Sequence, residues 1–329
     1  MPGIHRRTLL QLAAGAAAAP ALAAPAAAAS WPDQPVRFIC PFAAGGPTDV
    51  AARLVAEAMS GVLPQRVIVE NRTGSGVVVG TEVVAKAAND GHTLLYSTIA
   101  HAVLRPLFSS LSFDPVKDFQ PVALVGTIPM LLMVNNAVPA KDLRELIAMF
   151  RDKPGQYNYG SSGAGGAVHL ATELFLRQAG RLKVNHIPYR GSAPAMPDLL
   201  NGNLTMFVNV ASDGIASVQR GATRALAVSG AQRLPQLPDV PTFAEAGLPG
   251  YEAYTWHMLL APAGIPAETL ARLNAAVNQV MRTPALQQRF SDMSIQPRAD
   301  STPASATEWL QGEIAKWEPV VREAGITAN

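Results

Sequence analysis

The chain has 329 residues, of which 49% are hydrophobic, so it is long enough to form one large or two medium domains with buried cores. Its 26 Lys and Arg residues nearly balance its 24 Asp and Glu residues. Because no segment concentrates enough basic residues to neutralise several phosphates, the composition argues against nucleic acid or a membrane surface as partner and favours a small molecule.

The N-terminal segment has the features of an export signal. The pair Arg6 and Arg7 precedes an apolar run at residues 12–19, and small residues suited to cleavage follow. We therefore expect residues 1–29 to be a signal peptide that is removed, and the mature protein to be periplasmic. The arginine pair leaves twin-arginine and general secretory export both open. No later apolar run is long enough to span a membrane.

Beyond residue 30, short apolar runs alternate with helical patterns, which indicates an α/β fold with largely parallel sheets. Helical patterns occupy residues 48–59, with Thr48 or Asp49 as cap, and residues 81–88 and 168–178. Residues 266–324 contain three further helical patterns and no strand. The predicted strands are residues 36–41, 67–70, 93–97, 120–125, 130–135, 156–159, 184–187, 205–208, 224–228 and 253–260.

The number of predicted strands bears on the domain organisation. Ten strands are more than one compact open sheet commonly holds, so we expect two sheets in two lobes. The extended segments 122–134 and 251–261 are the expected crossings between the lobes. This organisation assigns residues 30–125 and 252–329 to a discontinuous first domain and residues 126–251 to a second.

One local device occurs twice: an apolar strand, a glycine-rich loop and the start of a helix. Residues 42–49 form the first loop and residues 160–166 the second. Such a turn directs unpaired backbone N–H groups and the positive end of a helix dipole towards one point, which suits an anion. Two such loops that face each other would hold a carboxylate or phosphate from both sides. The alternatives are an ordinary strand-to-helix turn for the first loop and a glycine linker for the second.

The second loop also nearly forms a G-x-S-x-G nucleophile elbow, with Ser162 as the nucleophile. Ala164 replaces the last glycine of that motif, and only three histidines follow in the chain. An exported serine hydrolase that uses Ser162 is therefore an alternative function. The six histidines show no metal-ligand spacing, and a single cysteine excludes an internal disulfide. We expect no metal, no cofactor and no catalytic residue in the leading interpretation.

Collinear motifs extend along nearly the whole mature chain. They include PFAAGGPTD at 41–49, VENR at 69–72, IPYRG at 187–191, LPDVPT at 237–242 and APAG at 261–264. Together they resemble the Bug or TctC family of exported solute receptors, which are the binding proteins of tripartite tricarboxylate transporters. The chain departs from the family pattern at Ala216-Ser217, where a Pro-His pair is common, and this difference bears on ligand choice.

The resemblance implies a two-lobed periplasmic-binding-protein fold, type II-like, in which two α/β domains close on a ligand. It further implies a receptor that binds a small carboxylate or dicarboxylate and delivers it, as a monomer, to the membrane components of a tripartite tricarboxylate-type transporter, without catalysis. A receptor that signals to a sensor kinase is the other open alternative. The candidate ligand-binding residues are Phe42, Ala43, Gly45, Gly46, Thr48 and Asp49 on one wall, Ser161, Ser162, Gly165, Gly166 and His169 on the other, and Thr98, His101, Asn209 and Ser212 beside them.

Overall fold

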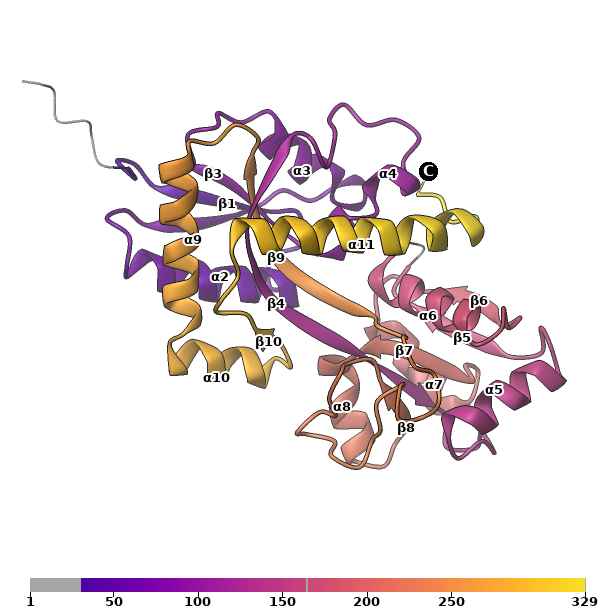
Figure 1. The fold of residues 1–329 in the computed structure, drawn as a ribbon. Helices are drawn as coiled ribbons and strands as arrows, with labels where there is room; N and C mark the ends of the chain where they lie inside the picture. The colour runs from indigo at the N-terminus through magenta and orange to yellow at the C-terminus, as the bar shows by residue number, and fades with distance from the viewer. Residues whose placement is uncertain (1–30, 164, 329) are drawn as a thin grey trace, which may run out of the picture.

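The computed structural model describes residues 31–163 and 165–328, so the expected signal peptide at 1–29 lies outside it. Within the described residues, ten strands are connected in the order β2-β1-β3-β9-β4-β7-β5-β6, and β8 and β10 also pair with β4 (Figure 1). The strands are β1 (Val36–Cys40), β2 (Val67–Asn71), β3 (Thr93–Ser97), β4 (Phe119–Val134), β5 (Asn158–Ser161), β6 (Asn185–Pro188), β7 (Met206–Val210), β8 (Arg224–Val228), β9 (Tyr254–Pro262) and β10 (Gln296–Pro297).

The helices agree with the predicted helical patterns, including three in the C-terminal segment. The predicted cap of the first helix is wrong, because Gly46 and neither Thr48 nor Asp49 occupies that position. The helices are α2 (Pro47–Ser60), α3 (Val78–Ala85), α4 (Leu104–Leu107), α5 (Leu143–Asp152), α6 (Ala167–Gln178), α7 (Met196–Asn201), α8 (Ala211–Gln219), α9 (Ala267–Met281), α10 (Pro284–Asp292) and α11 (Pro303–Glu323).

Strand β4 connects two halves of the sheet. Its residues up to Pro129 pair with β9, whereas Met130 and the residues after it pair with β7 and β8. In the first half β1 pairs in parallel with β2 and β3, and in the second half β5 pairs in parallel with β6 and β7. All pairings of β4 and β9 are antiparallel. The sheet is therefore mixed, and the expectation of largely parallel sheets is wrong.

The structure also corrects two strand predictions. The predicted strands 120–125 and 130–135 fall in the single strand β4, which ends at Val134, and the C-terminal segment contains β10. A Cβ on Gly126 would lie 2.7 Å from Cγ2 of Ile295 and 2.9 Å from the carbonyl oxygen of Gln296. Gly126 thus allows β10 to pack closely on β4 and does not end the strand. Two residues are too few to give β10 a periodic pattern.

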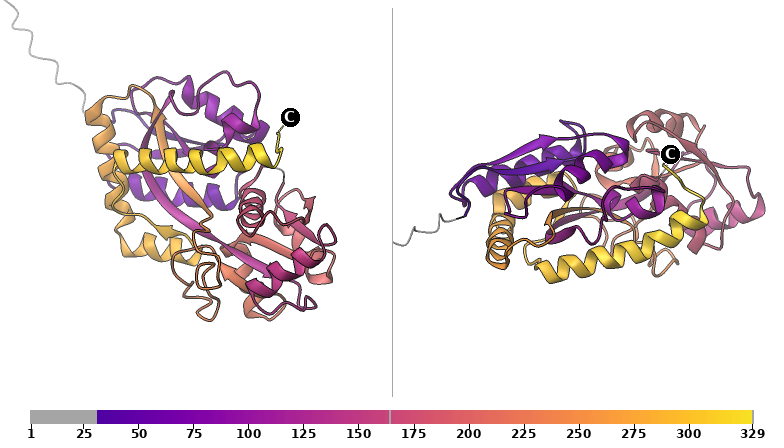
Figure 2. Two further views of the ribbon diagram at one scale, coloured as in Figure 1. Left: turned by 45° about the vertical axis from the view of Figure 1, so that its right-hand side comes forward. Right: turned by 90° about the horizontal axis from the view of Figure 1, so that it is seen from above.

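Helix α11 lies across β4 and β9 and extends towards α6 (Figures 1 and 2). Its Glu313 is 3% exposed and accepts hydrogen bonds from the indole nitrogens of Trp256 in β9 and Trp317, each at 2.9 Å. Near its end, Arg177 of α6 forms an ion pair with Glu323 at 2.9 Å. Helix α11 therefore contacts strand β4 and, beyond it, helix α6 of the second half. In the part of the chain that the structure describes, no helix combines the length and apolar character that a membrane span requires.

Candidate ligand-binding cleft

A cavity of about 560 Å³ lies between the two halves of the sheet. Loops after β1 and β3 line it from the first half, and loops after β5 and β7 line it from the second. The carboxyl ends of neighbouring parallel strands are the usual ligand position in open α/β sheets. The residues that line the cavity are Phe42, Gly45, Pro47, Thr48, Val50, Thr98, Ile99, Ala100, Ile128, Ser162, Gly166, Ala167, Val168, Ser192, Val210, Ser212, Asp213, Thr255, His257, Met293 and Ile295.

Asp49 holds the first glycine loop in place from the first turn of α2. Its Oδ2 accepts hydrogen bonds from the backbone N–H of Gly45 at 2.8 Å and from Nε of Arg53 at 2.9 Å. Its Oδ1 accepts from Nδ2 of Asn71 at 2.8 Å. Desolvation alone would raise the pKa of this buried carboxyl, but the bonds from Arg53, Gly45 and Asn71 together lower it. Asp49 is therefore ionised at neutral pH.

His169 has the corresponding position in the second loop, in the first turn of α6. Its Nδ1 accepts a hydrogen bond from the backbone N–H of Gly165 at 3.0 Å. Its ring stacks on the ring of His186, with the centroids 3.9 Å apart and the planes 14° apart. Burial, and secondly the charge of His186, lower the pKa of His169 to about 3. The imidazole is therefore neutral at neutral pH and is available as an acceptor.

The two loops share one backbone geometry. The N-cap residues have nearly identical angles, φ −73° and ψ 164° at Gly46 and φ −70° and ψ 161° at Gly166. The preceding glycines, Gly45 and Gly165, have φ of +78° and +73°, in the left-handed region that favours glycine. Both loops connect a strand directly to a helix, which excludes the glycine-linker interpretation of the second.

Residues at the N-terminus of each helix line the cavity. The first backbone hydrogen bond of α2 runs from Val50 N to Gly46 O, and that of α6 from Leu170 N to Gly166 O. The N–H groups of Thr48 and Val168 thus precede the helical ladder, and both residues line the cavity.

The structure places the predicted site residues at two depths. One set lines the cavity, and the other, called the supporting set, does not; most of its members are buried, but Ala43 is exposed. The lining set is Phe42, Gly45, Thr48, Thr98, Ser162, Gly166 and Ser212, and the supporting set is Ala43, Gly46, Asp49, His101, Ser161, Gly165, His169 and Asn209.

Two members of the supporting set have structural partners of their own. Nε2 of His101 lies 2.7 Å from the carbonyl oxygen of Pro115, and its ring meets that of Phe119 edge-on. Oδ1 of Asn209 accepts hydrogen bonds from Oγ of Ser192 and from the backbone N–H of Val210, both at 2.8 Å. Asn209 therefore fixes the start of α8 against the loop that follows β6.

Several lining residues were missed from the sequence. Thr255 and His257 alternate along β9, and this period of two is a signal that could have placed them on one face. Asp213 follows β7 in a third strand-to-helix connection, which lacks the glycines of the other two. Met293 and Ile295 come from the loop before β10, where no pattern indicates a site.

The lining of the cavity carries few charged side chains. None of the described residues that line it is Lys or Arg, and its one acidic side chain is Asp213. Desolvation raises the pKa of Asp213. Burial lowers the pKa of His257 to about 4, so this imidazole is neutral at neutral pH. Across residues 31–163 and 165–328, no group of three His, Cys, Asp or Glu side chains is arranged to hold a metal ion.

The arrangement around Ser162 differs from that of a nucleophile and its base. His186 Nε2 lies 2.6 Å from Oγ of Ser161, the preceding residue, which is fully buried. Among the described residues, no histidine forms a hydrogen bond with the hydroxyl of Ser162. The serine that the cavity exposes and the serine that a histidine contacts are thus different residues.

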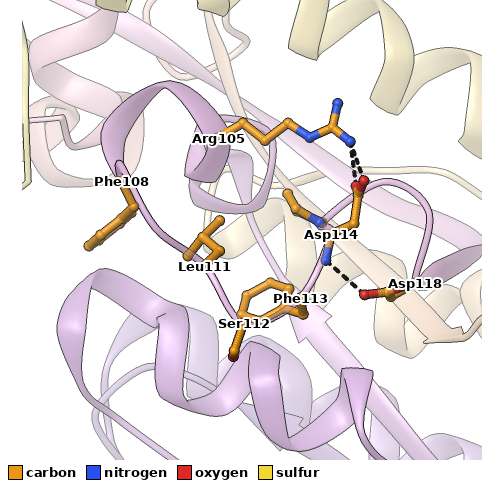
Figure 3. Close-up of a pocket in the computed structure, with 8 residues that line it drawn as sticks. Arg105, Phe108, Leu111, Ser112, Phe113, Asp114 and Asp118 are labelled. Atoms are coloured by element: carbon orange, nitrogen blue, oxygen red, sulfur yellow. Dashed lines mark hydrogen bonds and ion pairs between the residues drawn. The ribbon is translucent and has the colours of Figure 1, made fainter.

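A second hollow lies at the surface between α4 and the start of β4 (Figure 3). The guanidinium group of Arg105, which lines this hollow, contacts both carboxylate oxygens of Asp114. The backbone N–H of Asp114 donates to Oδ2 of Asp118 at 2.7 Å. Because Asp114 neutralises Arg105, this hollow is a poorer anion site than the cavity between the halves.

A sheet in two halves, with one cavity at the facing carboxyl ends of their strands, defines a two-lobed ligand-binding protein. The family described as Tripartite tricarboxylate transporter family receptor matches residues 51–326, and the chain belongs to this family. Protein BugT of Bordetella pertussis is 36% identical over 298 residues, which cover 90% of this chain and 91% of BugT.

Two solved structures show the same fold. Rpa4515 of R. palustris, solved with adipate, is 34% identical with a TM-score of 0.76, and the match covers 90% of this chain and 99% of that one. MatC from Rhodopseudomonas palustris, with bound malate, is 33% identical with a TM-score of 0.74, over 88% of this chain and 100% of that one. The predicted family and the predicted two-lobed periplasmic-binding-protein fold are both confirmed.

Proposed function

We propose that this protein is an exported receptor that binds a small carboxylate or dicarboxylate in the cleft and passes it to the membrane components of a tripartite tricarboxylate-type transporter. It performs no catalysis and acts as a monomer in the periplasm. The observation that carries the proposal is that the N-termini of α2 and α6 open onto one cavity from opposite halves of the sheet. A carboxylate there accepts hydrogen bonds from backbone N–H groups of both halves.

The composition of the cavity supports a small organic acid. Hydroxyl groups of Thr48, Thr98, Ser162, Ser192 and Ser212 supply further donors to a carboxylate. Apolar side chains then surround the body of the ligand, and they are Phe42, Pro47, Val50, Ile99, Ile128, Val168, Val210, Met293 and Ile295. Adipate and malate, which the two solved relatives carry, have this combination of carboxylate and carbon chain.

We also propose the domain division that the sequence suggests, with residues 30–125 and 252–329 in one domain and residues 126–251 in the other. The change of partners along β4 supports it, because the first half of that strand pairs with β9 and the second with β7 and β8.

Residues 1–29 serve as the export signal. Fractionation of cells that express the full chain tests this, and a processed protein in the periplasmic fraction is the expected result.

A thermal-shift screen followed by calorimetry tests ligand binding. The screen pairs each carboxylate with its neutral amide, for example adipate with adipamide, so that the two ligands differ in charge and little in shape. We expect the carboxylate to raise the melting temperature and the amide to have no effect, because only a bound ligand stabilises the folded state. Failure of every carboxylate, including aromatic and amino acids, would contradict the proposal.

A further inference from the structure

Asp213 is a charged group that the proposed carboxylate site does not require. It lies in the first turn of α8, it lines the cavity, and it is an exposed residue. Its polar neighbours in the chain are Ser212, whose Oγ lies 3.4 Å from Oδ1, and the side chain of Asn209, and both are uncharged. No lysine or arginine among the described lining residues neutralises it.

The N-terminus of α8 differs from those of α2 and α6 in the charge that it presents to the cavity. All three helices begin at the cavity, but α8 already carries its own carboxylate at the third helical position, where it satisfies the positive end of the helix dipole. The carboxylate of Asp49 in α2 is instead turned towards Gly45 and Arg53, away from the lining surface. An anionic ligand group is therefore attracted to α2 and α6 and repelled from α8.

A polar atom in the cavity wall has no hydrogen-bond partner among the described residues. His257 is 2% exposed and lines the cavity, and its Nδ1 forms no hydrogen bond with the described residues. A buried polar atom without a partner is costly unless a ligand or water satisfies it. A ligand with a single carboxylate and no other polar group would leave both Asp213 and His257 unsatisfied.

We propose that Asp213 is a specificity-determining residue, which selects ligands that carry a cationic or hydrogen-bond-donating group, such as an ammonium, in addition to one carboxylate. This inference rests on the proposed function. The carboxylate binds at α2 and α6, the ammonium pairs with Asp213, and apolar side chains of the cavity enclose the carbon chain between them. A second carboxylate near Asp213 brings two like charges together in a partly desolvated site.

Matched ligand pairs test the inference on the unmodified protein. Adipate and 6-aminohexanoate have the same chain length, and so do terephthalate and 4-(aminomethyl)benzoate, but one end differs in charge. We expect calorimetry to give at least about tenfold tighter binding of the amino member of a pair than of its dicarboxylate. Tighter binding of both dicarboxylates overturns the inference and leaves the proposed function intact. Failure of all four ligands and of the wider carboxylate screen overturns both.

Two variants separate the charge of Asp213 from its shape. Asp213→Asn keeps the volume and Asp213→Ala removes the group, and both are expected to reduce the preference for the amino ligand to about equal affinity within each pair. Asp152→Asn is the matched control, because Asp152 is an exposed acidic residue of the same half outside the cavity lining. An unchanged preference in the Asp213 variants overturns the inference, as does an equal loss in Asp152→Asn.

Discussion

The two glycine loops have the same backbone and different chemistry. In each, the third helical residue accepts a hydrogen bond from the N–H of a left-handed glycine, with Asp49 bonded to Gly45 and His169 bonded to Gly165. The first acceptor is a carboxylate that an arginine and an asparagine also hold, and the second is a neutral imidazole stacked on another. The comparison shows that a loop with this geometry needs an acceptor at one position and does not need a charge there.

The surroundings of the two acceptors explain the difference. Arg53 is available beside Asp49, so an ionised group is stable there despite burial. His169 lies against Tyr159 and His186, and the centroids of the Tyr159 and His186 rings are 5.0 Å apart. A carboxylate already lies beside this stack, because Glu173 accepts a hydrogen bond from the hydroxyl of Tyr159 and lies 3.9 Å from Nε2 of His169. A second carboxylate at position 169 would therefore face a like charge.

The largest expected effect comes from removal of the charged acceptor. Asp49→Ala leaves the N–H of Gly45 and the guanidinium of Arg53 without their buried partner, and we expect a loss of about 3 kcal/mol in the free energy of unfolding. Urea unfolding measures it. Asp49→Asn, which keeps one acceptor oxygen, is expected to lose less. Equal losses in the two variants would mean that the acceptor role is unimportant.

The second-largest effect on stability is expected at the left-handed glycines, whose surroundings differ between the two loops. A Cβ on Gly165 would lie 2.8 Å from Cδ2 of Leu107, whereas a Cβ on Gly45 would meet no atom within 4 Å. We therefore expect Gly165→Ala to cost about 2 kcal/mol and Gly45→Ala about 1 kcal/mol, the latter from backbone strain alone. A double-mutant cycle with Leu107→Val checks the cause. If the clash is real, Leu107→Val should cost less stability in the Gly165→Ala variant than in the wild type, because the shorter side chain relieves the clash. Additive losses would exclude the clash.

Acid titration separates the two acceptors by pH. The folded pKa of His169, about 3, lies below its ordinary value of 6.5, so between these values the unfolded state binds a proton that the folded state does not. Stability from His169 is thus complete above about pH 6.5 and falls by up to about 1.4 kcal/mol per pH unit as the pH decreases. The lowered pKa of Asp49 causes a loss only below its ordinary value of 3.8.

Buried His101 and His257 add to the same slope, because burial also lowers their pKa values to about 4. The variant His169→Asn isolates the contribution of one residue, since it offers a neutral oxygen acceptor and does not titrate. The difference between the wild-type and His169→Asn stability curves should therefore slope between about pH 6 and pH 4. Parallel curves over that range would refute the account of His169.

The smallest effect is expected at Ser162, which lines the cavity and which the proposed function places against the ligand. Ser162→Ala removes a hydroxyl from the cavity wall, and we expect about fivefold weaker carboxylate binding, equivalent to about 1 kcal/mol, with an unchanged melting temperature. Ser112→Ala, outside the cavity, serves as control. A large loss of stability in Ser162→Ala would assign this serine to the supporting set.

Much of this architecture follows from local sequence signals. The strands, the principal helices and both glycine loops have strong patterns, because each apolar run and each glycine acts within a few residues. The gap between the predicted strands at 120–125 and 130–135 is ambiguous, because Gly126 within it can end a strand or admit a neighbouring one. Only the tertiary packing of Ile295 decides between these outcomes. The two-residue strand β10 has no local signal.

The site was less predictable than the fold. The loops were found by their glycines, but whether a residue lines the cavity or supports the wall depends on the side-chain partners that distant segments supply. His101 turns towards Pro115, and Asn209 turns towards Ser192. No glycine-rich loop precedes Asp213, so the sequence gives no local signal for it. Its importance depends on the absence of lysine and arginine from the other described lining residues, which only the assembled cavity shows.

The central claim is that two loops from opposite halves hold one carboxylate, and a crystal structure with 6-aminohexanoate or adipate, whichever binds more tightly, tests it most directly. The account predicts carboxylate oxygens within about 3 Å of backbone N–H groups at the starts of both α2 and α6. A carboxylate held by one loop alone, or bound in the hollow beside Arg105, would contradict it.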